Sequence, residues 1–341
     1  MNIKYHIALF MVFLSIPNCK KTHLPPLEWK LVQENASWSP RDSQGEVVYG
    51  NYMWIFGGWH DSYEAPPRDV WRSENGVEWE QVTDNAPWIH SDLPMSITFN
   101  NKMWIMGGWY NGRLEGRSAS NAVWSSQNGK DWTLVTHGAA WSPRCAAAVI
   151  SFKGKMWILG GTSEYYYGGD ASLLNDVWCS QDGESWTLMT DSAGWSPRAY
   201  HQAAVLNDKI YIMGGGNYDP EHWCYNDVWS SSDGITWELE TEHAPWHKRI
   251  WFSSVTYRDH IWVLGGWSGN PYKNWDDVWY SSNGKDWKEF KLEGSKWKER
   301  HEHAVFVFQD KLWIAGGMIP PLTNDVWSLQ LPENWESDQG S

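Results

Sequence analysis

The fold of this chain is constrained most strongly by a sequence unit that recurs about every fifty residues. One half of the unit has two Trp residues eight positions apart, with an Asn-Gly or Asp-Gly dipeptide between them. It occurs five times, and its copies begin at Trp71, Trp124, Trp178, Trp229 and Trp279. These dipeptides favour type I′ turns, which need positive φ at both central residues. Each copy therefore predicts two antiparallel strands, C and D, joined by a tight turn.

The other half of the unit precedes this hairpin. A Gly pair follows an apolar run such as Met103–Met106 in all six repeats. Sixteen residues before the pair stands an Arg in five repeats and Ser91 in the second. Unbroken apolar runs of this length are typical of strands covered on both faces. The second half therefore predicts two more strands, A and B.

The two ends of the chain together supply the four strands of one repeat. Asp325-Val326-Trp327 begins a sixth strand C, but no Asn-Gly turn or strand D follows it. Residues 27–32 match residues 77–82, which belong to a strand D. We expect the N-terminal segment to join the C-terminal strands A–C, because a closed ring has no exposed sheet edge. The sequence thus predicts an all-β, six-bladed propeller with four-stranded blades over residues 27–331, and a tail over 332–341.

The period near fifty, the Gly pair after strand B and the later Trp together resemble the kelch repeat over nearly the whole mature chain. The resemblance implies a kelch-type propeller, of the superfamily that includes galactose-oxidase-type propellers. It also implies that the B–C and D–A connections share one face. We call the opening on that face the mouth.

The first residues are expected to lie outside the propeller. An apolar run, residues 7–16, follows Lys4 and precedes Cys19, which resembles a bacterial lipoprotein signal. We predict a signal peptide over residues 1–18, lipidation of Cys19 and a tether over 19–26. The chain is then exported, either as a cell-envelope lipoprotein at the periplasmic or outer-membrane face or as a secreted protein. The three remaining cysteines permit at most one disulfide.

A net charge of −14 disfavours nucleic acid as a partner, because its phosphates are bound by Lys and Arg. The same charge disfavours adsorption to anionic membranes, so we expect membrane contact only through the lipid anchor. We further expect a monomer with a glycan or protein ligand, and no resident cofactor or metal.

Length variation between repeats falls almost entirely in the B–C connections, where binding specificity is normally built. These connections are rich in aromatic residues, and the strand A starts of blades four to six depart from the repeat. Rings with apolar faces and polar edges suit sugars and peptide side chains. The candidate ligand-binding residues are Trp59, His60, Trp109, Tyr110, Tyr165, Tyr166, Tyr200, His201, Trp251, Trp267, His301 and Glu302.

The Arg series is interpreted as structural. Five repeats have Arg at the start of strand A and Asp at the start of strand C, whereas the second has Ser91 and Ala122. Joint loss in one blade indicates a buried ion pair, since removal of one partner would leave a buried charge. The predicted structural residues are Arg41, Asp69, Arg144, Asp176, Arg198, Asp227, Arg249, Asp277, Arg300 and Asp325.

The favoured function is an exported, non-catalytic binding module that recognises its ligand through the mouth. One alternative is a carbohydrate-active enzyme, such as a sugar mutarotase or epimerase, with Glu302 or His201 as acid or base. Another is a copper-radical oxidase, because Arg198-Ala199-Tyr200-His201 looks like the Tyr-His segment of galactose-oxidase-type enzymes. The equivalents of Tyr200 in the other blades offer no second Tyr, which disfavours copper. The residues that depart from the repeat at the strand A starts of blades four to six could also form a metal site, but their spacing is not diagnostic; they are Tyr200, His201, Trp251, His301, Glu302 and His303.

Overall fold

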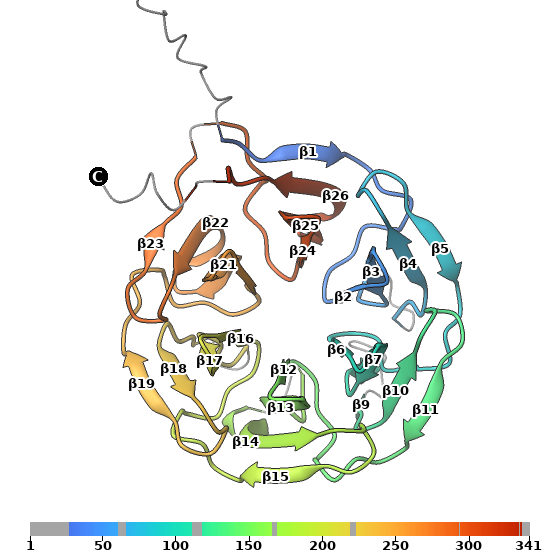
Figure 1. The fold of residues 1–341 in the computed structure, drawn as a ribbon, viewed down its shortest axis with the longest axis vertical. Helices are drawn as coiled ribbons and strands as arrows, with labels where there is room; N and C mark the ends of the chain where they lie inside the picture. Colours follow the sequence, from blue (N-terminus) through green and yellow to red (C-terminus); the bar gives the residue numbers. More distant parts are fainter. Residues whose placement is uncertain are drawn as a thin grey trace, which may run out of the picture.

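The computed structural model describes residues 27–60, 66–110, 118–165, 169–218, 223–292, 294–333 and 335. They form six four-stranded antiparallel sheets set around one axis, which confirms the predicted six-bladed propeller (Figure 1). The predicted signal peptide, the tether with Cys19, and Tyr166 lie outside the described residues. No helix in the described ranges is long and apolar enough to cross a bilayer.

Each blade runs from an innermost strand A to an outermost strand D. Blade one consists of β2 (Gly45–Tyr49), β3 (Tyr52–Phe56), β4 (Val70–Ser73) and β5 (Glu80–Thr83). Blade two consists of β6 (Met95–Phe99), β7 (Lys102–Met106), β10 (Val123–Ser126) and β11 (Thr133–Thr136). Blade three consists of β12 (Ala148–Phe152), β13 (Lys155–Thr162), β14 (Leu173–Ser180) and β15 (Thr187–Thr190). Blade four consists of β16 (Gln202–Leu206), β17 (Lys209–Met213), β18 (Val228–Ser231) and β19 (Glu238–Thr241). Blade five consists of β20 (Ser253–Tyr257), β21 (His260–Gly269), β22 (Tyr272–Ser281) and β23 (Lys288–Glu289).

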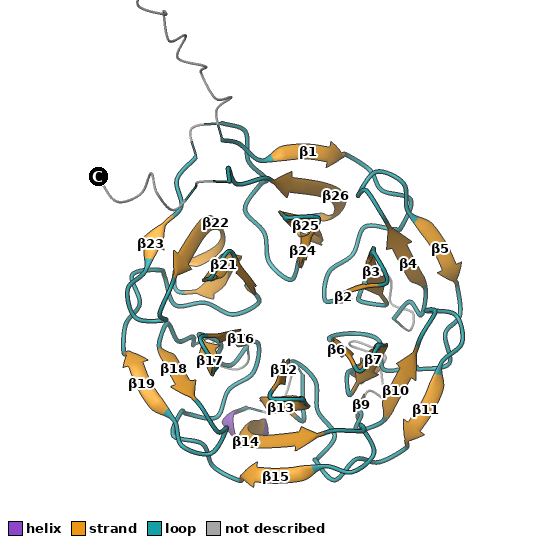
Figure 2. Cartoon of the chain, viewed as in Figure 1, coloured by secondary structure: helices purple, strands orange, loops and turns teal. Residues whose placement is uncertain are grey.

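The sixth blade joins both ends of the chain. It consists of β24 (Ala304–Phe308), β25 (Lys311–Met318), β26 (Leu322–Leu329) and β1 (Lys30–Gln33). β1 lies antiparallel to β26, with Leu31 opposite Trp327 (Figure 1). This pairing confirms the predicted closure of the ring by the N-terminal strand D. Two short elements lie in B–C connections: the ribbon of β8 (Trp109–Tyr110) and β9 (Ser118–Ala119), and the 3-10 turn η1 (Asp170–Ser172) (Figure 2).

The C–D connections differ from the two-residue type I′ turn that the sequence predicted. In blade one, β4 ends at Ser73 and β5 begins at Glu80, and Gly76 has positive φ whereas Asn75 does not. The Ser73 hydroxyl accepts a hydrogen bond from the Gly76 amide at 2.8 Å. The Asn75 side chain accepts from the amides of residues 77 and 78. These side-chain hydrogen bonds stabilise a longer loop, so the type I′ prediction is wrong.

Tryptophan pairs hold strand D to each blade. The strand D Trp meets, edge to face, a Trp three residues before the Arg position of the same blade, with ring centroids 5.8–6.1 Å apart. The six pairs are Trp29–Trp297, Trp38–Trp79, Trp88–Trp132, Trp141–Trp186, Trp195–Trp237 and Trp246–Trp287. Edge-to-face contact suits the quadrupoles of the rings and adds about 0.5–1.5 kcal/mol per pair beyond area burial.

Neighbouring blades are fitted together by a Trp-to-Gly contact. The strand B ring Trp54 of blade one lies against Gly129 in the C–D connection of blade two, where a Cβ atom would collide with the ring. Equivalent contacts join Trp104 to Gly183 and Trp313 to Gly76. The Gly of the Asn-Gly motif is therefore required for interblade packing as well as for positive φ.

Blade six has no C–D connection, because its strands C and D come from opposite ends of the chain. Trp262, on strand B of blade five, is instead packed against Trp335, with ring centroids 5.4 Å apart. Trp335 is buried and also contacts Tyr280 and Phe290. A residue that the sequence placed in the tail thus covers the ring that a turn glycine meets in the other blades.

We predict that Trp335→Ala lowers the free energy of unfolding by about 3–5 kcal/mol, because it opens a cavity beside Trp262. The control is Leu31→Ala on β1, a residue that is 47% exposed, with an expected cost below about 0.5 kcal/mol. Urea unfolding of both variants measures the difference. Equal stability of the two variants would show that Trp335 does not contribute to the core.

Candidate functional site

The strand A starts and the B–C connections meet at one end of every blade. In each blade, the residue after the Arg position forms a β-bridge with the residue after the Gly pair. The bridges are Asp42–Trp59, Asp92–Trp109, Cys145–Thr162, Ala199–Gly216, Ile250–Trp267 and His301–Met318. The repeat therefore fixes where each variable connection begins.

A ring of six residues surrounds the axis at this end. They share a left-handed backbone with φ between 48° and 57°, and they are Ser43, Leu93, Ala146, Tyr200, Trp251 and Glu302. Backbone hydrogen bonds join neighbours in the ring, such as Leu93 N to Ser43 O at 3.0 Å and Glu302 N to Trp251 O at 2.8 Å. Non-glycine residues rarely adopt this conformation. We call this ring the collar.

The collar separates two cavities. On one side lies the mouth cavity of about 490 Å³, and on the other an axial channel of about 300 Å³ between the strands A. Ser43, Trp251 and Glu302 line both cavities. The mouth cavity is of the size that accepts a small ligand or a few side chains.

Tryptophans that do not belong to the repeat gather around the mouth. The paired rings, the strand C tryptophans and the strand B tryptophans account for 23 of the 30. Of the other seven, Trp335 has been described, and the remainder lie at the collar, in the B–C connections or on the mouth ends of β21 and β22: Trp59, Trp109, Trp223, Trp251, Trp267 and Trp275. Because the scaffold does not require them, they are candidates for function.

Most mouth rings pack against one another. Trp251 contacts Tyr218 at 4.7 Å and Trp267 at 5.4 Å between centroids, and it stacks on His301 at 5.0 Å. Trp251 and Trp267 are only 8% and 3% exposed, whereas Tyr272 is 73% exposed. The predicted aromatic surface is therefore largely a packed cluster, with Tyr272 at its rim.

The other predicted ligand residues divide by location. Trp59 and Tyr165 line the mouth cavity, as do Trp267, His301 and Glu302. Tyr200 and His201 contribute to the lining of the axial channel and not to that of the mouth cavity. The Tyr200 ring nevertheless packs against Tyr165 and Trp251, and its hydroxyl donates to the Tyr165 carbonyl at 3.2 Å.

Three predicted residues lie outside both cavity linings. Trp109 is buried in the aromatic cluster. Tyr110 lies beside His90, and His60 is half-buried after Trp59. The structure thus brings only part of the predicted set around one space.

A cluster of carboxyl groups lies at the floor of the mouth. The Ser43 hydroxyl is 2.9 Å from Glu302 Oε1 and 3.3 Å from Asp42 Oδ1. Asp92 is 1% exposed, and its Oδ1 has no hydrogen-bond partner among the described residues. Glu302 comes from blade six, whereas Asp42 and Asp92 come from blades one and two.

Burial dominates the ionisation of this cluster. It raises the pKa of Asp92 to about 7. Burial, reinforced by the charge of Asp92, raises the pKa of Asp42, and burial with both neighbouring carboxylates raises the pKa of Glu302. Burial lowers the pKa of His301 to about 3, so this ring is neutral at pH 7. Deeper in the channel, burial raises the pKa of Glu46 to about 8.

The sequence interpretation missed Asp42 and Asp92. Both occupy the position after the Arg site, where the other blades have Cys145, Ala199, Ile250 and His301. An acid at a position near the axis that is apolar in three of the other four blades was the available signal.

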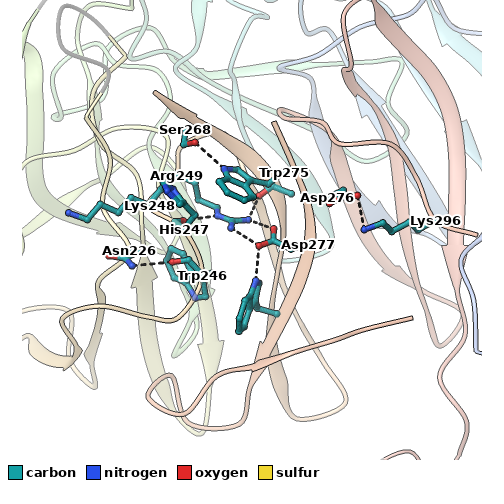
Figure 3. A network of polar contacts seen from close by, with 12 residues as sticks. Asn226, Trp246, His247, Lys248, Arg249, Ser268, Trp275, Asp276, Asp277 and Lys296 are labelled. Carbon is teal, nitrogen blue, oxygen red and sulfur yellow. Dashed lines mark hydrogen bonds and ion pairs between the residues drawn. The ribbon is translucent and has the colours of Figure 1, made fainter. Parts of the chain in front are cut away.

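The ten predicted structural residues form five ion pairs beside the mouth. In blade five, the Arg249 guanidinium donates to both Asp277 carboxylate oxygens, at 2.6 and 2.8 Å, and to the Gly265 carbonyl at 2.7 Å (Figure 3). The same bidentate geometry joins Arg41–Asp69, Arg144–Asp176, Arg198–Asp227 and Arg300–Asp325. Burial alone would raise the pKa of Asp277, but the hydrogen bonds and charge of Arg249 hold this pKa below its ordinary value. These arginines therefore use their N–H donors to hold the scaffold together.

We predict that Arg144→Ser or Asp176→Ala alone lowers the free energy of unfolding by about 3–5 kcal/mol, because each leaves a buried charge unpaired. The double variant, which copies the residues of blade two, should be at least about 2 kcal/mol more stable than the sum of the single losses. Urea unfolding of the four proteins completes the cycle. Additive losses would mean that the pair is not energetically coupled.

A family model matches nearly the whole chain. The model describes the KLHDC2/KLHL20/DRC7 kelch-repeats domain, and it matches residues 21–215 and 183–338.

Individual proteins resemble the chain over part of its length. The flagellar outer arm dynein alpha chain of Chlamydomonas reinhardtii is 27% identical over 192 residues, which cover 50% of this chain and 4% of that protein. The leucine-zipper-like transcriptional regulator 1 homolog of Drosophila melanogaster is 28% identical over 167 residues, 44% of this chain and 16% of that protein. Kelch domain-containing protein 3 of Rattus norvegicus is 24% identical over 232 residues, 62% of this chain and 58% of that protein. The chain thus spans less than two thirds of each relative.

Proposed function

Because the chain belongs to the kelch-repeat family of β-propellers, we propose that it is a binding module whose mouth accepts a protruding segment of a partner protein. One observation carries the proposal: residues that break the repeat, from blades one, three, four, five and six, line a single cavity of about 490 Å³. An invariant scaffold that bears variable loops around one space is a common basis of specific recognition.

The packing of the rings favours a protein segment over a glycan. A sugar stacks on the exposed face of a ring, whereas Trp251 and Trp267 are buried in contact with other rings. Tyr272 remains exposed at the rim, and Trp59 is half-buried. Tyr and Trp edges with polar groups beside them are typical of protein-interaction hot spots. The alternative carbohydrate-active functions have no comparable supporting observation.

The test is selection of ligands against the whole chain. A displayed peptide library and a glycan array are screened in parallel, and the selected ligands are measured against variants. We expect peptides whose affinity falls at least tenfold with Tyr272→Ala or Trp59→Ala, corresponding to about 1.4 kcal/mol or more.

The matched control is Leu239→Ala, an exposed residue on β19 at the outer rim of blade four. This variant should bind the peptides as the wild type does. Ligands that are exclusively glycans, or peptides that bind all variants equally, would contradict the proposal.

We also propose, from the sequence alone, that the chain is exported and anchored at the cell envelope through a lipid on Cys19. The propeller would then act as a monomer without a nucleic-acid partner. Bacterial expression with labelled palmitate tests the anchor: the wild type should incorporate label and Cys19→Ser should not. An unlabelled wild-type protein would contradict lipidation.

A further inference from the structure

We propose that Asp42, His301 and Glu302 form a divalent-metal site at the floor of the mouth. A carboxylate oxygen of Asp42, a ring nitrogen of His301 and a carboxylate oxygen of Glu302 all lie within 4.8 Å of one another. Ligand atoms about 2 Å from one Zn²⁺ are separated by roughly 3–4 Å, so small side-chain rotations complete the set. All three residues line the mouth cavity.

The hydrogen bonds of His301 prepare one ring nitrogen for a metal. Asn274 Nδ2 donates to the Met318 carbonyl at 3.2 Å, which directs Asn274 Oδ1 toward His301 Nδ1 at 2.7 Å. An amide oxygen only accepts, so Nδ1 carries the proton and Nε2 carries the lone pair. Nε2 lies 3.6 Å from Glu302 Oε2. Metal-binding histidines are oriented in this way, by donating the other ring N–H to a fixed acceptor.

Acceptor atoms face one another here, and Lys273, the one Lys or Arg among the described residues that line the mouth cavity, lies over the Trp275 ring instead. No Lys or Arg of the described ranges forms an ion pair with Asp42, Asp92 or Glu302. The unpartnered Oδ1 of Asp92 is buried beside the same floor. A bound divalent cation would offset the repulsion between these acceptor atoms.

The ligand set indicates the class of metal. One imidazole nitrogen with two carboxylates suits borderline or harder ions such as Zn²⁺, Co²⁺ and Mn²⁺, whereas Cu(I) prefers sulfur and Ca²⁺ takes six to eight oxygens. Three protein ligands leave at least one coordination position open. Because all three residues line the mouth cavity, an oxygen or nitrogen of a ligand bound in that cavity would complete the coordination. The site does not depend on whether the partner is a protein.

Cobalt titration of the full chain, stripped with chelator, tests the site. We expect one Co²⁺ per chain, visible absorption bands that appear on binding, and competition by Zn²⁺. Glu302→Gln and His301→Gln should weaken binding by at least tenfold. Asn274→Leu removes a positioning residue, and it should weaken binding 10- to 100-fold and shift the absorption bands.

Glu46→Gln is the matched control, because it removes a buried acid of the axial channel that is not among the three ligands. It should bind Co²⁺ as the wild type does. Circular dichroism checks that each variant is folded. If the ligand variants fail to fold, pulsed electron paramagnetic resonance of wild-type protein with Mn²⁺ decides: one imidazole nitrogen at the ion supports the site, and none overturns it. Absent Co²⁺ binding, or binding unchanged in folded Glu302→Gln and His301→Gln, also overturns it.

Discussion

The architecture of the mouth depends on the buried Arg–Asp pair that recurs in five blades. A guanidinium has five N–H donors in a fixed plane, and in blade one Arg41 directs them to Asp69, the Gly57 carbonyl and Ser39. These acceptors belong to the start of strand C, the end of strand B and the D–A connection. One side chain thus holds three segments together at the mouth end. A connection that leaves this point can vary in length and composition without disturbing the sheet.

Most of the fold could be predicted because the residues that form the strands, turns and ion pairs recur from one repeat to the next. Closure by residues 27–32 followed from one missing strand D, and the Arg–Asp pairs followed from their joint absence in blade two. The turn type could not be predicted from the dipeptide alone, since the Ser73 and Asn75 side chains stabilise a longer loop. Trp335 occurs once, so no repeat indicated its partner.

The site was less predictable because its residues are the ones that depart from the repeat. Sequence identifies Trp109 and Trp267 as extra aromatics, but not that they would be buried against other rings. Burial of that kind depends on how connections from different blades pack, which spacing along one blade does not report. The acid cluster at the floor was difficult to predict for the same reason, since Asp42 and Glu302 are distant in sequence and adjacent in space. Such a site can be identified only when the positions of all six blades in space are known.

The ring also explains how a nearly symmetric scaffold can hold a ligand in one orientation. Six identical blades would offer six equivalent poses around the axis. Here the carboxyl groups come from blades six, one and two, whereas the rings of Tyr165, Tyr218 and Trp251 come from blades three to five. The acids are therefore confined to one half of the mouth, whereas rings line both halves, since Trp59 of blade one also lines the cavity. This asymmetry favours one orientation of a bound ligand over the six that identical blades would allow.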